Sequence, residues 1–351
     1  MQQMSAQHAL RPDPLPPAGT VFAALPAPRE GRDTDSRKVG VEIEFGGLPA
    51  EQAARVVVSV LGGTPEKRAP GDWRITGGDL GPITLYLDTR WRPTEDSALA
   101  RSGVEFGRNF VPFEIVTEPL AQKDLPRLDH LLTDLAGEGA EGSGEGPLNG
   151  FGLHLNVELA DPERGTDMPR VALSFALLER WLRRRDPLAT GRRLLPFADP
   201  WPTALTSDLA GAWPGLDLEG LLAVLHRHVS SRNYGLDLLP AWAEVAPDDY
   251  RLWMENDTAV SARPTYHYRM PDCRIGAPGW SLAYEWNRWA LIEAVASDDD
   301  LLTTLCRDWW QHREVPMIPE REAWFRSVTN HLGRLADLAP EGGPRANEAS
   351  S

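Results

Sequence analysis

The alternation in residues 39–45, Val-Gly-Val-Glu-Ile-Glu-Phe, is the strongest constraint on how this chain folds. Successive side chains of a β-strand point to opposite faces, so the apolar residues share one face. Glu42 and Glu44 then stand side by side on the other face. Because glutamate is depleted in strands, the pair fits either the solvated face of an edge strand or a site that uses both carboxylates.

Three later segments repeat this division into an apolar face and a face of chemically active groups. Residues 113–118 carry Glu114 and Glu118, residues 151–159 carry His154 and Asn156, and residues 265–270 carry His267 and Arg269. A face that is merely solvated usually mixes Thr, Ser, Lys and Gln, whereas these residue types are ligands of metals and phosphates.

Neighbouring strands would bring these carboxylates together. Two bare charges about 4 Å apart repel by about 4 kcal/mol at an effective dielectric constant of about 20. Divalent cations would offset the repulsion. Hard oxygen ligands with only one or two imidazoles favour Mg²⁺ or Mn²⁺ over zinc.

The composition excludes several functions. The 351 residues include 36 Lys+Arg and 51 Asp+Glu, and this net charge of -15 argues against nucleic-acid binding and against an anionic membrane surface. The only lysines are Lys38, Lys67 and Lys123, so the Gly-rich phosphate loop that ends in Gly-Lys-Ser/Thr is absent. Two cysteines and the lack of a long apolar run predict a soluble protein in the reducing cytoplasm.

We expect one catalytic domain over residues 38–338, between a Pro-rich segment, residues 1–37, that is mostly disordered or loosely packed on the surface, and a disordered tail, residues 339–351. Further strands are predicted at residues 73–75 and 83–88. Helices are predicted at residues 51–61, 124–135, 169–185, 217–230, 281–296, 301–312 and 320–337. Residues 137–146 are predicted to be a flexible linker, with a mobile flap as the alternative, and residues 199–215 to be irregular.

The order of these motifs resembles the glutamine synthetase / glutamate–cysteine ligase superfamily, and more closely its amidoligase branch. The matching pieces are Gly-x-Glu-x-Glu at residues 40–44, the Trp…Glu-Asp-Ser segment at 91–97, the Glu strand at 114–118, Gly-x-His-x-Asn at 152–156, Arg-Asn-Tyr at 232–234, the Arg strand at 266–269 and the Trp-containing helix at 286–292. The resemblance covers residues 39–296. It implies an α+β fold, with a curved antiparallel sheet of the glutamine synthetase catalytic type and helices packed on its apolar face.

The resemblance also implies a reaction, in which ATP and Mg²⁺ (or Mn²⁺) drive the joining of a carboxyl group to an amine through an acyl phosphate. Glu44, Glu114 and Glu118 would hold one metal ion, and Glu42 and His154 the second. Asn156 and Arg269 would lie against the nucleotide, and Arg269 and Arg263 would stabilise the transferring phosphoryl group. Asp96, Arg232 and Arg274 would contact substrates, which would be an amino acid, peptide or protein carboxylate and an amine. The resemblance is compatible with a homo-oligomer.

His267 departs from the superfamily, in which a glutamate is the expected metal ligand at this position. An imidazole can bind a metal but removes one negative charge, and a buried, hydrogen-bonded histidine is the alternative. Two other functions therefore stay open. One is a module that binds nucleotide and metal without turnover, and the other is a phosphotransferase that acts on a guanidino-type acceptor.

Overall fold

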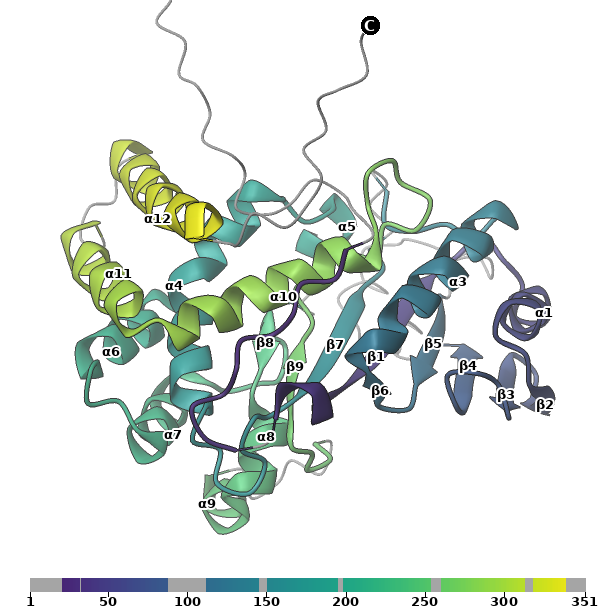
Figure 1. Cartoon of the computed structure of the whole chain (residues 1–351), viewed down its shortest axis with the longest axis horizontal. Helices are drawn as coiled ribbons and strands as arrows, with labels where there is room; N and C mark the ends of the chain where they lie inside the picture. Colours follow the sequence, from purple (N-terminus) through teal and green to yellow (C-terminus); the bar gives the residue numbers. More distant parts are fainter. Residues whose placement is uncertain are drawn as a thin grey trace, which may run out of the picture.

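The computed structural model describes residues 21–31, 33–87, 112–144, 150–194, 198–253, 260–312 and 318–338. In this part of the chain an open sheet of nine strands forms the centre of an α+β fold (Figure 1). The strands are β1 (Lys38–Phe45), β2 (Thr64–Ala69), β3 (Asp72–Thr76), β4 (Ile83–Leu87), β5 (Phe113–Thr117), β6 (Leu120–Ala121), β7 (Leu153–Glu158), β8 (Leu236–Asp237) and β9 (Thr265–Tyr268).

The sheet runs in the order β2-β3-β4-β5-β1-β7-β9-β8, with β6 paired to β1, and its strand pairs are antiparallel. β1 therefore lies between β5 and β7. Val41 and Ile43 of β1 are fully buried, as are Leu153 and Leu155 of β7. The alternation that predicted one apolar face in each strand is thus confirmed, and this face forms the core.

Helices cover the apolar face of the sheet. α1 (Ala50–Leu61) packs on β3 and β4, α3 (Leu125–Gly137) packs on α1, and α10 (Leu282–Ser297) packs on α3 and α4 (Met168–Arg185). α10 crosses the sheet near β7 and β9, and α11 (Asp299–His312) and α12 (Ile318–Leu338) lie beyond α4 (Figure 1). The remaining helices are α5 (Thr190–Leu194), α6 (Thr203–Ala212), α7 (Leu218–His228), α8 (Leu239–Val245), α9 (Pro247–Trp253), η1 (Thr34–Ser36) and η3 (Gln122–Asp124).

Part of the Pro-rich N-terminal segment packs against the rest of the fold where the structure describes it. Val21 and Ala23 hydrogen-bond with the Asn287 side chain of α10, and Leu25 joins the core. The carbonyl oxygen of Ala23 accepts a 2.8 Å hydrogen bond from the Trp286 indole N–H. Arg37 forms a buried ion pair with Glu293, at 2.6 Å. Composition does not show these partners, because they lie on α10, far away in the sequence.

The structure corrects the predictions for residues 137–146 and 199–215. Residues 140–144 are packed rather than free, because Glu141 bridges to Gly46 and the Ser143 backbone N–H donates to the carbonyl of Cys273, 2.6 Å away. The stretch expected to be irregular at residues 199–215 contains the helix α6. No helix in the described segments combines the length and the apolar character needed to traverse a membrane.

Candidate metal-binding site

The register of the sheet gathers polar side chains on the face opposite the core. The cross-strand partners are Glu44 with Glu114 (β1–β5), Glu42 with His154 (β1–β7), Asn156 with His267 (β7–β9) and Asp237 with His267 (β8–β9). Side chains directly opposite each other on one face of a sheet are in contact. The sequence prediction that acidic and imidazole groups from separate strands converge is therefore met by the structure.

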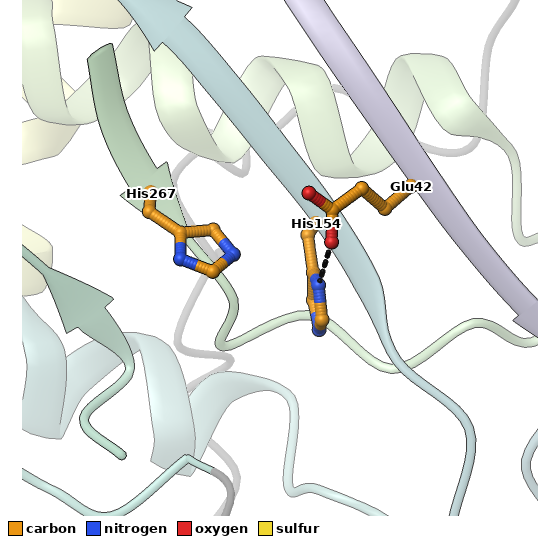
Figure 2. Close-up of side chains that lie close together, drawn as sticks. All are labelled: Glu42, His154 and His267. Atoms are coloured by element: carbon orange, nitrogen blue, oxygen red, sulfur yellow. Dashed lines mark hydrogen bonds and ion pairs between the residues drawn. The ribbon is translucent and has the colours of Figure 1, made fainter. Parts of the chain in front are cut away.

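Glu42 and His154 form the best-defined pair of the site (Figure 2). A Glu42 carboxylate oxygen lies 2.8 Å from His154 Nδ1, and the other oxygen accepts a 2.9 Å hydrogen bond from the Asn156 amide. Burial opposes ionisation of Glu42, but the hydrogen bonds from His154 and Asn156 hold its pKa well below the usual value. Burial also lowers the pKa of His154 to about 3. At neutral pH an ionised Glu42 thus faces a neutral imidazole.

This pairing decides which nitrogen of His154 is available. An ionised carboxylate can only accept hydrogen bonds, so Nδ1 of His154 carries the proton and Nε2 carries a lone pair. His154 is 1 % exposed, and Nε2 has no hydrogen-bond partner among the described residues. A buried polar atom without a partner costs about 1–3 kcal/mol. Coordination to a cation would satisfy Nε2 and remove this cost.

His267 has the same arrangement. Its Nδ1 lies 3.2 Å from a carboxylate oxygen of Asp237, and within the described chain its buried Nε2 also lacks a hydrogen-bond partner. The rings of His154 and His267 meet edge to face, with centroids 5.2 Å apart. A metal-binding histidine usually donates one ring N–H to a carboxylate and coordinates the metal through its other ring nitrogen. The two imidazoles point into the same region of the sheet face (Figure 2).

Two sets of side chains have their ligand atoms within 4.8 Å of one another: Glu44, Glu114 and His154, and Glu42, His154 and His267. Glu44 is 5 % exposed and Glu114 is fully buried, so both carboxylates are shielded from water. Two carboxylates with one imidazole suit Mg²⁺ or Mn²⁺. The second set has a larger share of nitrogen, which suits the softer divalent metals.

Gly152 lies against two members of the set Glu44, Glu114 and His154. Its backbone N–H donates a 2.7 Å hydrogen bond to Glu44, and a side chain at this position would come within 2.9 Å of His154 Nε2. Glycine therefore lets the backbone approach both ligands closely. This explains physically why the Gly-x-His-x-Asn motif begins with glycine.

Two arginines lie beside the histidines. Arg269, which follows β9, is 5 % exposed, and its guanidinium donates a 3.0 Å hydrogen bond to the carbonyl of Arg232. Burial has the largest effect on the pKa of His154, followed by the interaction with Glu42. The positive charge of Arg269 also lowers this pKa. Arg232 Nε lies 3.4 Å from Asp237. The structure thus brings Arg232 and Arg269, two of the four predicted arginines, next to the imidazoles.

The remaining predicted residues lie elsewhere. Glu118 is 54 % exposed and pairs with Arg74 at 3.4 Å; it shares a face with Glu114 but is four residues further along, or about 13 Å in an extended strand. Arg263 is exposed before β9. Arg274 pairs with Asp186 at 2.6 Å and with Asp272 at 3.3 Å rather than with the ligands. Asp96 lies outside the described residues.

Sequence reasoning missed Asp237 and Arg192. Asp237 belongs to β8, which has two residues and is too short to show an alternating pattern. Arg192 belongs to α5, a helix of five residues, and its guanidinium lies against Gly152. An isolated Asp and an Arg in such short elements give no sequence signal of a site.

Comparison with protein families identifies the family of this chain. The sequence matches the family described as "Putative amidoligase enzyme" over residues 35–291, which is more than half of the chain. No curated protein matches it. The matched region includes β1, β5, β7 and β9, which supply the two ligand sets. The amidoligase part of the resemblance is therefore confirmed, and the chain belongs to this family of ligase-type enzymes.

Proposed function

We propose that the protein is an ATP-dependent carboxylate–amine ligase that uses one divalent cation, Mg²⁺ or Mn²⁺, held by Glu44, Glu114 and His154. Membership of the amidoligase family supports ligation. The observation that carries the metal assignment is the buried Nε2 of His154, which has a lone pair, lacks a partner in the described chain and lies with two carboxylates. We also propose that the antiparallel sheet is of the glutamine synthetase catalytic type.

We assign Glu42 a role that differs from the sequence prediction. Its carboxylate already engages His154 Nδ1, so it orients the imidazole and keeps it in the tautomer that coordinates. The set of Glu42, His154 and His267 shares His154 with the first set, and a second ion there would require Glu42 to release His154. The protein without nucleotide should therefore bind one Mn²⁺ tightly.

His267 is compatible with activity in this arrangement. The glutamate expected at its position would supply a negative charge, and Asp237 supplies a carboxylate 3.2 Å from the His267 ring. The local charge is therefore restored from the neighbouring strand β8. This favours an enzyme over a module that has lost turnover.

The reaction would proceed in two displacements. A substrate carboxylate oxygen attacks the γ-phosphorus of ATP, ADP leaves, and the amine then attacks the acyl carbon, with inorganic phosphate as the leaving group. The bound cation would supply positive charge to the phosphate oxygens. Arg269 is held by the Arg232 carbonyl and would stabilise charge that develops on the transferring phosphoryl group. Asn156, which donates to Glu42, lies on the same face and would contact the nucleotide.

The test is ADP release by the full chain with ATP, Mg²⁺ or Mn²⁺, and a panel of amino acids and peptides. With hydroxylamine as the amine, the acyl phosphate should yield a hydroxamate. His154→Gln should abolish both products, and Glu158→Gln on the same strand should not. Nucleotide-dependent thermal stabilisation without ADP would instead indicate a binding module. A stable phosphorylated product with no amine consumed would indicate a phosphotransferase.

A further inference from the structure

Arg192 is a buried arginine that the proposed chemistry has not yet used. It is 2 % exposed, and its Nη2 donates to the carbonyl oxygens of Arg269 and Pro271, at 2.5 and 3.3 Å. Its Nε lies 3.4 Å from Asp272. Asp272 itself accepts a 2.6 Å hydrogen bond from the Ala189 backbone N–H and pairs with Arg274. The guanidinium is therefore fixed on one side by groups that are fixed in turn.

The other side of the guanidinium faces the candidate metal site. A Cβ built on Gly152 would lie 2.6 Å from Arg192 Nη1 and 2.9 Å from His154 Nε2. Two atoms this close to a single point are neighbours. Within the described residues, Nη1 has no hydrogen-bond partner, whereas Nη2 has two. An N–H donor thus lies within a few ångströms of the nitrogen that would bind the cation.

This placement has an electrostatic consequence. A unit positive charge and a divalent cation about 5 Å apart repel by roughly 7 kcal/mol at an effective dielectric constant of about 20. Asp272 and the ligand carboxylates offset part of this repulsion. An oxyanion bound between the cation and Nη1 would be attracted to both of them and would offset their repulsion. Arg is well suited to this role because its donors are fixed and its charge is permanent.

We propose that Nη1 of Arg192 binds an oxyanion of the reacting group, phosphoryl or carboxylate, at the cation held by Glu44, Glu114 and His154. This inference rests on the proposed function, because it needs a cation at that site. Asp272 and the carbonyls of Arg269 and Pro271 then position Arg192 for this contact. Arg274 does not contact the ligands, and it supports the position of Arg192 through its ion pair with Asp272.

The test uses calorimetric titration of the full chain, wild type and Arg192→Gln, with Arg192→Lys as the variant that keeps the charge. Mn²⁺ is titrated first. AMP-PNP and acetate are then titrated separately onto the Mn²⁺-loaded protein. Arg37→Gln is the matched control, since Arg37 is also buried and bound to a carboxylate and to a backbone carbonyl, that of Glu158. Thermal melting reports the stability of each variant.

Arg192→Gln should bind Mn²⁺ as tightly as wild type or more tightly, since a neighbouring cation is gone, and should lose at least tenfold in affinity for an anion. Loss for AMP-PNP identifies the phosphoryl group, and loss for acetate the substrate carboxylate. Arg192→Lys should lose less. Arg37→Gln should melt lower with unchanged affinities.

Equal anion affinity in wild type and Arg192→Gln would overturn the inference about Arg192 but leave the metal site in place. The same conclusion would follow if neither protein bound an anion. A parallel loss of Mn²⁺ and anion affinity would show a purely structural role. If wild type fails to bind Mn²⁺, the proposed function itself falls, together with this inference.

Discussion

Replacing Glu44 by glutamine removes one of the two carboxylates that β1 and β5 hold opposite each other. The ligand atoms of Glu44 and Glu114 lie within 4.8 Å. Two unit charges at this separation repel by about 3.5 kcal/mol at an effective dielectric constant of about 20. Glutamine keeps an acceptor for the Gly152 N–H, and loss of the charge on that hydrogen bond costs about 1 kcal/mol. If relief of this repulsion outweighs the weakened hydrogen bond, the metal-free variant is more stable than wild type, and this is the result we expect.

Addition of Mn²⁺ should reverse this difference in stability between the variant and wild type. Mn²⁺ at about 100 times its Kd stabilises a protein that binds it by about 2.7 kcal/mol. Wild type should gain this stability, and Glu44→Gln should gain little because one of its ligands is weakened. The order of stability of the two proteins should thus invert on addition of Mn²⁺. Urea unfolding with EDTA and with Mn²⁺ measures both free energies.

Glu158→Gln is the matched control for this experiment. Glu158 lies on β7 and accepts a hydrogen bond from the Lys38 backbone N–H, as Glu44 does from Gly152, but belongs to neither ligand set. Its variant should respond to Mn²⁺ as wild type does. If Glu44→Gln is less stable than wild type without metal and is stabilised equally by Mn²⁺, Glu44 is structural and the repulsion argument is refuted.

Two further predictions concern Glu42 and Glu285, a buried carboxyl group of α10 that belongs to neither ligand set. Glu42→Gln should weaken Mn²⁺ binding by about 10–100-fold, as expected when the orienting partner of a ligand is lost, whereas His154→Gln should abolish it; equal losses in Mn²⁺ titrations would place Glu42 among the ligands. Burial raises the pKa of Glu285 from 4.5 to about 7, so its contribution to stability is complete below pH 4.5 and is lost as the pH rises through about 7. Glu285→Gln should therefore reduce the loss of unfolding free energy between pH 5 and pH 8 by up to about 3 kcal/mol, and an unchanged pH profile in urea titrations would contradict the role of this carboxyl.

The polar face of the sheet was predictable because the period of two is a local property of the chain. Val39 to Phe45 and the segment around His154 each show it without any knowledge of their neighbours. Burial of the apolar sides then orients the polar sides together. The central strands β1, β5, β7 and β9, and most of the ligand residues, follow from this rule.

The period gives the face of a residue but not its position along the sheet. Glu118 shares a face with Glu114, and the family resemblance grouped both as metal ligands, yet of these two residues it is Glu114, paired with Glu44 across β1 and β5, that joins a ligand set with His154. Register depends on partners that are distant in sequence. The same reason hid Asp237, because β8 acquires its role only by pairing with β9.

Tertiary partners also determine how part of the N-terminal segment packs. Trp286 and Glu293 of α10 bind Ala23 and Arg37. Composition describes what a segment can do alone, and these contacts span more than 250 residues of sequence.

The location of a bound cation tests the central claim most directly. A crystal structure of the full chain soaked in Mn²⁺ and AMP-PNP, with anomalous data, would show where the ion binds. We predict one strong anomalous peak about 2.2 Å from Glu44, Glu114 and His154 Nε2. An ion bound elsewhere, or His154 Nε2 left without a ligand at millimolar Mn²⁺, would contradict the account.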